Sequence, residues 1–247
     1  MQVGLIGAGN MGSALARGWG APVLASDNGS GRAAALVAEL GGEALADNAE
    51  LARRADLVVL AHKPAQLEAI AAHAAPHTGR VVSLLGRTTV AQLRAAYPDA
   101  QVTRAEPNIA VAVRKGVFVV PEGEGDDDDK VLALLAQLGT VVRVPEALMG
   151  VAGAVSGVGP AYVALIAEAW TDAAVKQGMP QREAAQLVQL TLAGAAELLA
   201  HDDTLSVRRA VTSPGGTTAR GLAALEREGI RRALAAATDD VVEFASR

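Results

Sequence analysis

The stretch Gly7-Ala8-Gly9-Asn10-Met11-Gly12 decides the fold expected for this chain. It ends an apolar run, Gln2–Gly7, and opens an amphipathic stretch, Met11–Gly18, which gives the order strand, glycine turn, helix. In a G-x-G-x-x-G turn the glycines permit a tight turn, close approach of the backbone to a pyrophosphate, and close packing of helix on strand. The helix N-terminus offers its amide groups to phosphates. The stretch therefore predicts a dinucleotide-binding fold.

The second expected strand, Pro22–Ser26, is followed by Asp27, twenty residues after Gly7. An acidic residue at this position usually accepts hydrogen bonds from the ribose 2′-hydroxyl of NAD. The same residue type also forms Asx turns and helix caps, and Arg32 is placed to meet the 2′-phosphate of NADP. The sequence leaves the choice between NAD and NADP open.

Short apolar runs alternate with amphipathic stretches through the first half of the chain, which indicates a mostly parallel sheet with helical crossovers. The further expected strands are Leu57–Ala61, Arg80–Leu85, Gln101–Ala105, Gly116–Pro121 and Thr140–Val144, and the further expected helices are Gly31–Leu40 and Val131–Leu138. We predict an α/β, Rossmann-type dinucleotide-binding domain over residues 1–147.

After Pro145 no strand-like run follows. The expected helices are Pro160–Gly178, Arg182–Leu199, Ser206–Val211, Thr218–Glu228 and Ile230–Ala245. We predict an all-α dimerisation domain over residues 148–247, because helices with small-residue faces often bury them against a second subunit. The expected assembly is a homodimer.

One uncharged segment, Ala147–Ala167, is long enough to span a bilayer. Its middle, Ser156–Pro160, has the composition of a turn followed by a proline at a helix start. We therefore expect two buried helices that meet at a loop, and no membrane span. The N-terminus lacks a basic leader, so we also expect no signal peptide and a cytoplasmic protein.

The composition excludes several classes of site and partner. The chain has 247 residues, a net charge of −5, no cysteine and 2% aromatic residues. There is thus no thiolate metal site or cysteine nucleophile, and no basic surface for nucleic acid. We expect no metal, because the four histidines lack ligand spacing and the charge run Glu122–Lys130 is typical of a solvated loop.

A second motif, Thr212-Ser213-Pro214-Gly215-Gly216-Thr217-Thr218, precedes an expected helix. A turn of this kind exposes consecutive backbone N–H groups, which form a nest for a small anion such as a substrate carboxylate. The alternative is an ordinary turn between helices with a threonine N-cap. Glu168 and Asp172, one turn apart on the helix after Pro160, either face the substrate or make structural hydrogen bonds.

Together with Ser156-Gly157-Val158-Gly159-Pro160-Ala161-Tyr162 and Gly178-Met179-Pro180, these two motifs resemble those of the pyrroline-5-carboxylate reductase family. Lys63-Pro64 and Arg104-x-x-Pro107-Asn108 match it as well. The resemblance covers nearly the whole chain. It implies reduction of 1-pyrroline-5-carboxylate to L-proline by NADP(H), with NAD(H) as an alternative, at the last step of proline biosynthesis. It also implies interlaced dimers, often in a ring, whose active sites lie between one subunit's nucleotide domain and its partner's helices.

The resemblance further implies which residues form the site. Those expected to bind the cofactor are Gly7, Gly9, Asn10, Met11, Gly12, Ser26, Asp27, Asn48, Ala61, Lys63, Pro64 and Asn108. Those expected to hold the substrate carboxylate are Ser213, Gly215, Gly216, Thr217 and Thr218. Hydride transfer to a protonated imine needs alignment more than a strong base, so we expect Thr218, or a water that it orients, to relay the proton to the ring nitrogen.

Three departures from the family pattern bear on the cofactor and the substrate. Glu106 stands where the family usually has methionine, and Ala110 where it has proline. Ser26-Asp27-Asn28 stands where the family usually has Ser-Asn-Arg, so the arginine expected for a 2′-phosphate is displaced or missing, and Leu84–Arg87 replaces a small-residue stretch. The alternatives are therefore a reductase of another cyclic imino acid or hydroxy acid, or a catalytically silent NAD(P)-binding regulator.

Overall fold

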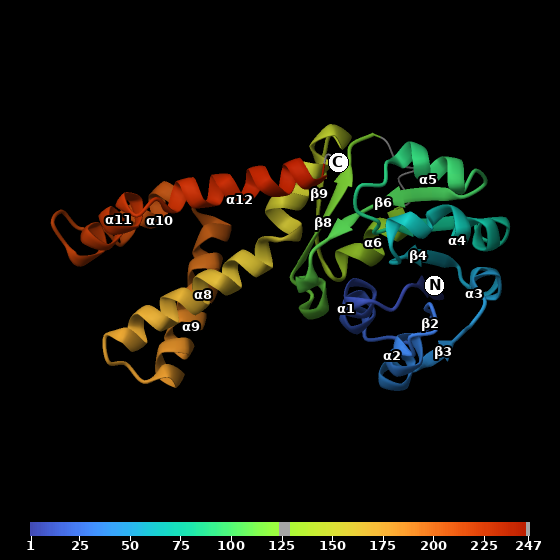
Figure 1. Ribbon diagram of the computed structural model, residues 1–247, viewed down its shortest axis with the longest axis horizontal. Coiled ribbons are helices and arrows are strands. Elements are labelled where there is room, and N and C mark those ends of the chain that lie inside the picture. The colour runs from blue at the N-terminus through green and yellow to red at the C-terminus, as the bar shows by residue number, and fades with distance from the viewer. Residues whose placement is uncertain (124–128, 246–247) are drawn as a thin grey trace. The chain divides into compact units, whose positions relative to one another are not determined.

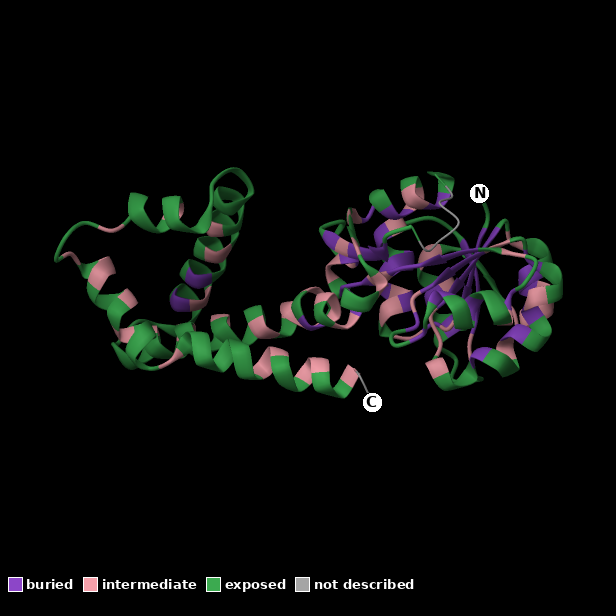
Figure 2. Ribbon diagram, turned by 90° about the horizontal axis from the view of Figure 1, so that it is seen from above, coloured by how far each residue is buried: buried purple, intermediate pink, exposed green. Residues whose placement is uncertain are grey.

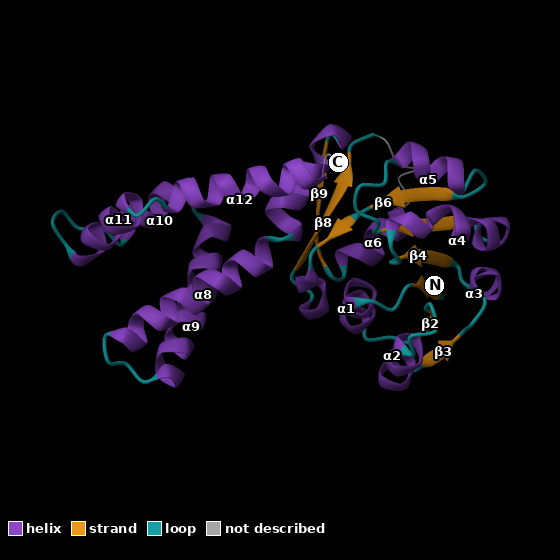
Figure 3. Cartoon of the chain, viewed as in Figure 1, coloured by secondary structure: helices purple, strands orange, loops and turns teal. Residues whose placement is uncertain are grey.

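The computed structural model describes residues 1–123 and 129–245, which form two compact units. The first unit comprises Met1–Pro160 and the C-terminal residues from Phe244, and the second comprises Ala161–Glu243. All strands belong to the first unit, as Figure 3 shows for the described residues. Part of the expected solvated loop within Glu122–Lys130 lies outside these residues. The predicted fold class, a Rossmann-like domain followed by an all-helical region, is confirmed.

The main sheet has six strands in the order β3-β2-β1-β4-β5-β6, and every neighbouring pair is parallel (Figure 1). The strands are β1 (Val3–Ile6), β2 (Val23–Ser26), β3 (Gly42–Ala44), β4 (Leu57–Leu60), β5 (Arg80–Ser83) and β6 (Gln101–Arg104). This order reverses direction between β1 and β4, where open α/β sheets bind their ligands. Strand β3 was not predicted, because its Gly-Glu-Ala sequence is fully exposed and carries no apolar signal.

Helices cover both faces of this sheet, because its central strands are apolar at every position. Leu5 packs into one core with α1 and α2, whereas its neighbour Ile6 packs into a second core with α3, α4 and α5. The helices of this unit are α1 (Asn10–Trp19), α2 (Arg32–Leu40), α3 (Asn48–Arg54), α4 (Leu67–Ala74), α5 (Val90–Ala96), α6 (Asp129–Ala136) and α7 (Met149–Ala152). Short 3₁₀ turns are η1 (Pro64–Gln66), η2 (Ala75–His77), η3 (Ile109–Val113) and η4 (Glu146–Leu148). Helices α3, α4 and α5 were not predicted, since they have only two turns each.

The strands β7 (Glu106–Pro107), β8 (Gly116–Pro121) and β9 (Gly139–Val144) form a separate sheet. The expectation that the last two strands continue the main sheet is wrong. Strand β8 pairs antiparallel with β7 and parallel with β9, so the chain leaves the main sheet directly after β6. Nothing in the apolar pattern of β8 distinguishes it from a strand of the main sheet.

The expected loop at Ser156–Pro160 is also wrong. A π-helical turn, η5 (Gly153–Gly157), joins α7 to α8 (Gly159–Lys176), so Glu146–Lys176 is nearly continuous helix. This stretch is long and apolar enough to cross a bilayer by length and composition alone, and 11% of its most apolar window is buried. The expected burial of this segment is therefore not found in a single chain.

The second unit consists of helices with little core of its own. They are α8, α9 (Gln181–His201), α10 (Thr204–Ala210), α11 (Thr217–Arg227) and α12 (Ile230–Ala245). Of its described residues, Ala184 and Val188 alone are buried, and Figure 2 shows the remaining surface as exposed or intermediate. Large apolar side chains such as Leu165 and Leu190 are more than 60% exposed. Exposed apolar faces of this extent mark an interaction surface that the single chain leaves uncovered.

Candidate functional site

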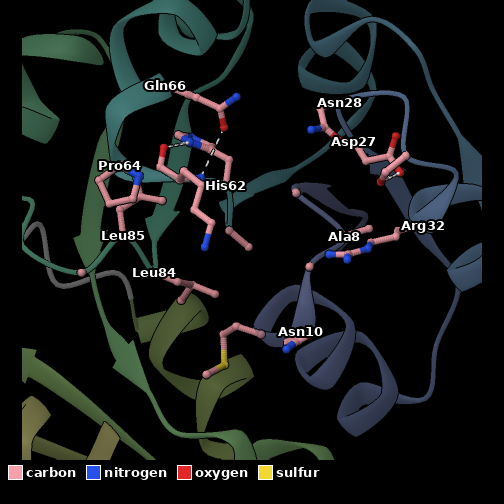
Figure 4. Close-up of a pocket in the computed structure, with 17 residues that line it drawn as sticks. Ala8, Asn10, Asp27, Asn28, Arg32, His62, Pro64, Gln66, Leu84 and Leu85 are labelled. Atoms are coloured by element: carbon pink, nitrogen blue, oxygen red, sulfur yellow. Dashed lines mark hydrogen bonds between the residues drawn. The ribbon is translucent and has the colours of Figure 1, made fainter. Parts of the chain in front are cut away.

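A cavity of about 510 Å³ lies at the carboxyl ends of the central strands (Figure 4). Four loops form it: those after β1, β2, β4 and β5. Its lining residues are Gly7, Ala8, Gly9, Asn10, Met11, Asp27, Asn28, Ser30, Arg32, Ala61, His62, Lys63, Pro64, Gln66, Leu84, Leu85 and Gly86. The cavity thus occupies the switch point between β1 and β4 that the fold reserves for ligands.

The three motif glycines of the first loop have different tasks. Gly7 has φ +109°, and a Cβ there would overlap the backbone of Ala61 and His62. A Cβ on Gly12 would overlap the carbonyl oxygen of Gly7, so this glycine packs α1 onto the strand. Gly9 has open space around its Cβ position and faces the cavity. Two glycines therefore serve the fold, and Gly9 leaves room for a ligand.

Among the described residues, no side chain caps the N-terminus of α1 and so competes with an anion there. Its N-cap is Gly9, no side chain caps the helix, and the first turn holds no acidic residue. The unsatisfied amide groups and the positive end of the helix dipole therefore suit a pyrophosphate. Two cations, Arg32 and Lys63, line the same cavity. The free amide groups of α1, the open space at Gly9 and the two cations together suit a dinucleotide.

Asp27 is engaged by its own loop. Its Oδ1 accepts a hydrogen bond from the N–H of Gly29 (2.8 Å), and its Oδ2 accepts from the N–H of Ala33 and the hydroxyl of Ser30 (2.9 Å each). These bonds, chiefly the one from Ala33, lower the pKa of the carboxyl group. Asp27 thus forms the turn that was the alternative to ribose binding, while it still borders the cavity. The turn also places Arg32 at the cavity (Figure 4).

The loop after β4 forms the opposite wall, where Figure 4 shows His62, Pro64 and Gln66 across from Asp27 and Arg32. Pro64 starts η1, and Gln66 closes the turn by donating its N–H to the carbonyl of Lys63 (3.0 Å). The Nδ1 of His62 lies 2.9 Å from the same carbonyl, so Nδ1 carries the proton and donates. Burial lowers the pKa of this imidazole, and its Nε2 is buried with no partner among the described residues.

Four residues expected at the cofactor do not line the cavity. Gly12 packs α1, and Ser26 bonds Asn48 behind the glycine turn. Asn108, 8% exposed, uses its Oδ1 to accept from the N–H groups of Ala110 and Val117 (3.3 Å each). The other expected cofactor residues, Gly7, Gly9, Asn10, Met11, Asp27, Ala61, Lys63 and Pro64, are brought together there.

Several lining residues were not among the expected set, notably Asn28, Ser30, Gln66 and the Leu84–Gly86 loop. A signal for them does exist in the sequence. Each lies at the end of an expected strand or in the segment that follows it, and the carboxyl ends of parallel strands share one edge of the sheet. Arg32, the alternative partner for a 2′-phosphate, and His62, to which the sequence assigns no role, both lie on the wall of the cavity.

The second motif forms an open turn at the start of α11 in the helical unit. Gly215 has φ +70°, and Gly216 donates its N–H to the carbonyl of Ser213 (3.1 Å). The N-cap of α11 is Gly216, with no capping side chain. The alternative of a threonine N-cap is therefore wrong. The N–H of Gly216 is engaged, but no side chain among the described residues caps the amide groups of the first turn of α11, as the nest interpretation requires.

Two family models match the chain. One, described as pyrroline-5-carboxylate reductase dimerisation, matches residues 146–247, and the other, described as NADP oxidoreductase coenzyme F420-dependent, matches residues 2–85. The pyrroline-5-carboxylate reductase of Methanosarcina acetivorans is 32% identical over 94% of this chain and 92% of its own length. That of Synechocystis is 37% identical over 76% of this chain and 73% of its own.

The chain belongs to the pyrroline-5-carboxylate reductase family. Solved structures of the family agree with this over the full length. The Plasmodium falciparum pyrroline carboxylate reductase with NADP bound superposes with a TM-score of 0.86 at 26% identity, covering 99% of this chain and 97% of that one. The Streptococcus pyogenes 1-pyrroline-5-carboxylate reductase gives 0.87 at 26% identity, covering 99% and 98%. The match to the dimerisation model supports a homodimer that acts on a small molecule.

Two departures from the reductase family have structural consequences in this chain. Glu106 does not point into solvent, because its carboxylate pairs with the buried guanidinium of Arg104 at 2.6 Å. The N–H of Ala110 bonds the side chain of Asn108, and a proline at that position would lack this donor.

Glu168 and Asp172 line a small cavity of about 260 Å³ within the helical unit.

Proposed function

We propose that this protein reduces 1-pyrroline-5-carboxylate to L-proline with NADP(H). Full-length membership of the reductase family carries this proposal, and both motifs that would hold cofactor and substrate are intact. NADP(H) when bound supplies the hydride, and the chain's residues bind and orient the reactants. NAD(H) remains the alternative donor.

The cofactor half of the site rests on the cavity in the first unit. The amide groups at the start of α1 would hold the pyrophosphate, with Gly9 leaving the space for it. Arg32 would meet the 2′-phosphate, since the turn built on Asp27 directs it to the cavity. The remaining expected cofactor residues do not line the cavity and would support the residues that do. They are Ser26, Asn48 and Asn108.

The substrate half rests on the turn before α11. Its amide groups, with the hydroxyls of Ser213 and Thr217, would bind the carboxylate of the cyclic imine. Thr218, one residue into the helix, would donate or relay the proton that the ring nitrogen needs. A protonated imine is already electrophilic, so alignment supplies most of the catalysis and no strong base is required.

The assembly follows from the same argument. Two chains would interlace their helical regions, taken from residue 148 as in the sequence prediction, and cover the exposed faces of α8 and α9. Each active site would combine the cavity of one subunit with the Ser213–Thr218 turn of its partner. A ring of such dimers and a cytoplasmic location complete the proposal.

The test is an assay of NADPH and NADH oxidation with 1-pyrroline-5-carboxylate. Turnover to proline with wild-type protein is expected, and Thr218→Ala should lower kcat by about 100-fold, the usual contribution of a positioned proton donor. Thr218→Ser, which keeps the hydroxyl, should recover most of it. Nucleotide binding without turnover would instead favour a regulator, and turnover of only another cyclic imine would favour the divergent reductase.

A further inference from the structure

A buried ion cluster lies at the end of β6. The guanidinium of Arg104, whose side chain is 6% exposed, donates to Glu106 Oε1 at 2.6 Å and to Glu146 Oε1 at 2.9 Å. Its Nε is buried with no partner among the described residues. One cation thus serves two carboxylates. Buried ion pairs of this kind are no more stable than a well-packed apolar group, which points to a positional task.

The cluster ties together the elements beside the nucleotide cavity. Arg104 ends β6 in register with Ser83, the residue that precedes the Leu84–Gly86 lining loop. Glu146, at the start of the long helical run, also accepts the N–H of Val90, which begins α5 after that loop. The segment from Ser83 to Val90, which contains the lining loop, is therefore anchored at both ends next to one guanidinium.

The cluster also reaches the π-helical turn η5. Glu106 and Asn108 are separated by one residue, and the side chains of both lie close to this turn. A Cβ on Gly153 would lie 3.2 Å from Glu106 Oε2, and the amide of Asn108 donates to the hydroxyl of Ser156 at 3.4 Å. π-helical turns are rare and need outside support, and they occur often at functional sites.

The position of the cluster along the sheet indicates which part of the cofactor it concerns. The adenosine half of a dinucleotide would lie over β2, where Asp27 and Arg32 border the cavity, and the pyrophosphate would lie at α1. The other half must run over β4 and β5, toward β6 and Arg104. The turn η5 contacts Glu106 and Asn108, which closely follow β6, so it lies toward the β6 side of the sheet.

We propose that Arg104 and Glu106 are positioning residues that hold η5, with Ser156 and Asn108, as the wall beside the reacting end of the cofactor. This inference rests on the proposed function, because its kinetic test measures kcat of the proposed reductase reaction. The cluster sets how the hydride donor and acceptor are aligned and leaves the grip on the phosphates unchanged. A displacement of about 1 Å in such a wall is enough to slow hydride transfer by about 100-fold.

The test replaces Glu106 by leucine and by glutamine. Glu106→Leu is expected to lower kcat at least about tenfold and to raise the primary isotope effect with 4-deuterated NADPH, while the Kd of NADPH stays within about threefold. Glu106→Gln, which keeps the Oε1 acceptor for Arg104, should recover most of kcat. Glu43→Leu, which breaks an exposed pair with Arg54, is the matched control and should keep kcat.

Unchanged kcat in Glu106→Leu, or a loss of kcat that merely follows the folded fraction, would overturn the inference. Ser156→Ala covers the case in which Glu106→Leu does not fold, and it should lower kcat in the same direction; an unchanged kcat there also overturns it. Amide hydrogen exchange of residues 153–158, expected to rise in Glu106→Leu, needs no turnover. It separates failure of this inference from inactivity of the wild-type protein with pyrroline-5-carboxylate, which would overturn the proposed function.

Discussion

The hydroxyl of Ser26 donates a 2.7 Å hydrogen bond to Oδ1 of Asn48, and the carbonyl of Ser26 accepts the N–H of Gly7 at 2.9 Å. Ser26, 1% exposed, therefore ties the end of β2 to both the glycine turn and the start of α3. Neither Ser26 nor Asn48 lines the cavity. The Ser26–Asn48 hydrogen bond instead supports the backbone of the glycine turn, on which the phosphates would rest.

We predict different effects for two changes at Asn48. Asn48→Ala leaves the buried Ser26 hydroxyl without its acceptor, which costs about 1–3 kcal/mol of folding stability. Asn48→Asp keeps an acceptor, so its Tm should stay close to wild type, but its charge should weaken NADPH binding about tenfold by repelling the phosphates. Thermal melts and fluorescence titration measure both. Wild-type affinity in Asn48→Asp would place Asn48 away from the cofactor.

The three motif glycines should separate folding from binding. Gly9→Ala meets no protein atom, so we expect a normal Tm and a rise of about tenfold or more in the Kd of NADPH, a loss of about 1.4 kcal/mol. Gly12→Ala forces α1 away from the strand and should lower Tm by several degrees. Gly79→Ala, which also has open space but lies outside the cavity, is the control for both measurements. Normal binding by Gly9→Ala would contradict a pyrophosphate at this turn.

Arg32 is expected to decide the preference for NADPH over NADH. A charge-assisted bond to the 2′-phosphate is worth about 1.5–3 kcal/mol, so Arg32→Ala should lower the ratio of the two kcat/KM values by about 10- to 100-fold. Asp27→Ala should instead weaken both coenzymes, because this carboxylate holds the loop through three hydrogen bonds. Arg17→Ala, which removes an exposed pair with Glu39, is the control. An unchanged ratio in Arg32→Ala would remove Arg32 from the 2′-phosphate site.

The glycine turn shows how far the sequence reaches. Its pattern predicts β1, α1 and the cavity beside them, because each glycine answers a backbone requirement that is local. The role of Asp27 is not local in that sense. Ribose binding and turn formation need the same carboxylate, and only the folded loop shows that Gly29, Ser30 and Ala33 engage it. The position of Arg32 follows from that turn.

Strand β8 and the π-helical turn mark where sequence patterns fail. The apolar run of β8 suits any buried strand, and its sheet is decided by pairing with the two-residue strand β7, which has no pattern of its own. The turn η5 depends on Glu106 and Asn108, more than forty positions earlier in the chain. Likewise, apolar periodicity predicts that α8 and α9 have apolar faces. It does not show that the single chain leaves these faces exposed.

The exposed apolar faces of the helical unit lead to a prediction about assembly. Leu190 on α9 is 62% exposed, and a dimer interface there would bury it. Leu190→Asp should therefore shift the protein from dimer to monomer at micromolar concentration and abolish turnover with it. Val142→Asp, on a comparably apolar surface position of β9, should stay dimeric. Sedimentation velocity measures the mass. A wild-type monomer at this concentration, or association with lipid vesicles instead, would overturn the dimer.

His62 should make the protein less stable in mild acid. Burial lowers the pKa of the folded imidazole below its usual value of about 6.5, so the unfolded chain takes up a proton first as the pH falls. The stabilising contribution is complete above the unfolded pKa and is lost as the pH falls through the folded pKa. The reason is structural: protonation would place an N–H on the buried Nε2, which has no acceptor among the described residues.

Denaturant unfolding at pH 7.5 and pH 5.5 measures this loss. Wild-type protein should lose more free energy of unfolding between the two pH values than His62→Gln, which cannot take up the proton. His73→Gln, a change on the exposed side of α4, should keep the wild-type profile. The same acidification should raise the Kd of NADPH in wild type more than in His62→Gln, because the loop of Lys63 and Pro64 forms one wall of the cavity. Equal pH profiles for wild type and His62→Gln would show that this imidazole stays neutral or finds a partner when protonated.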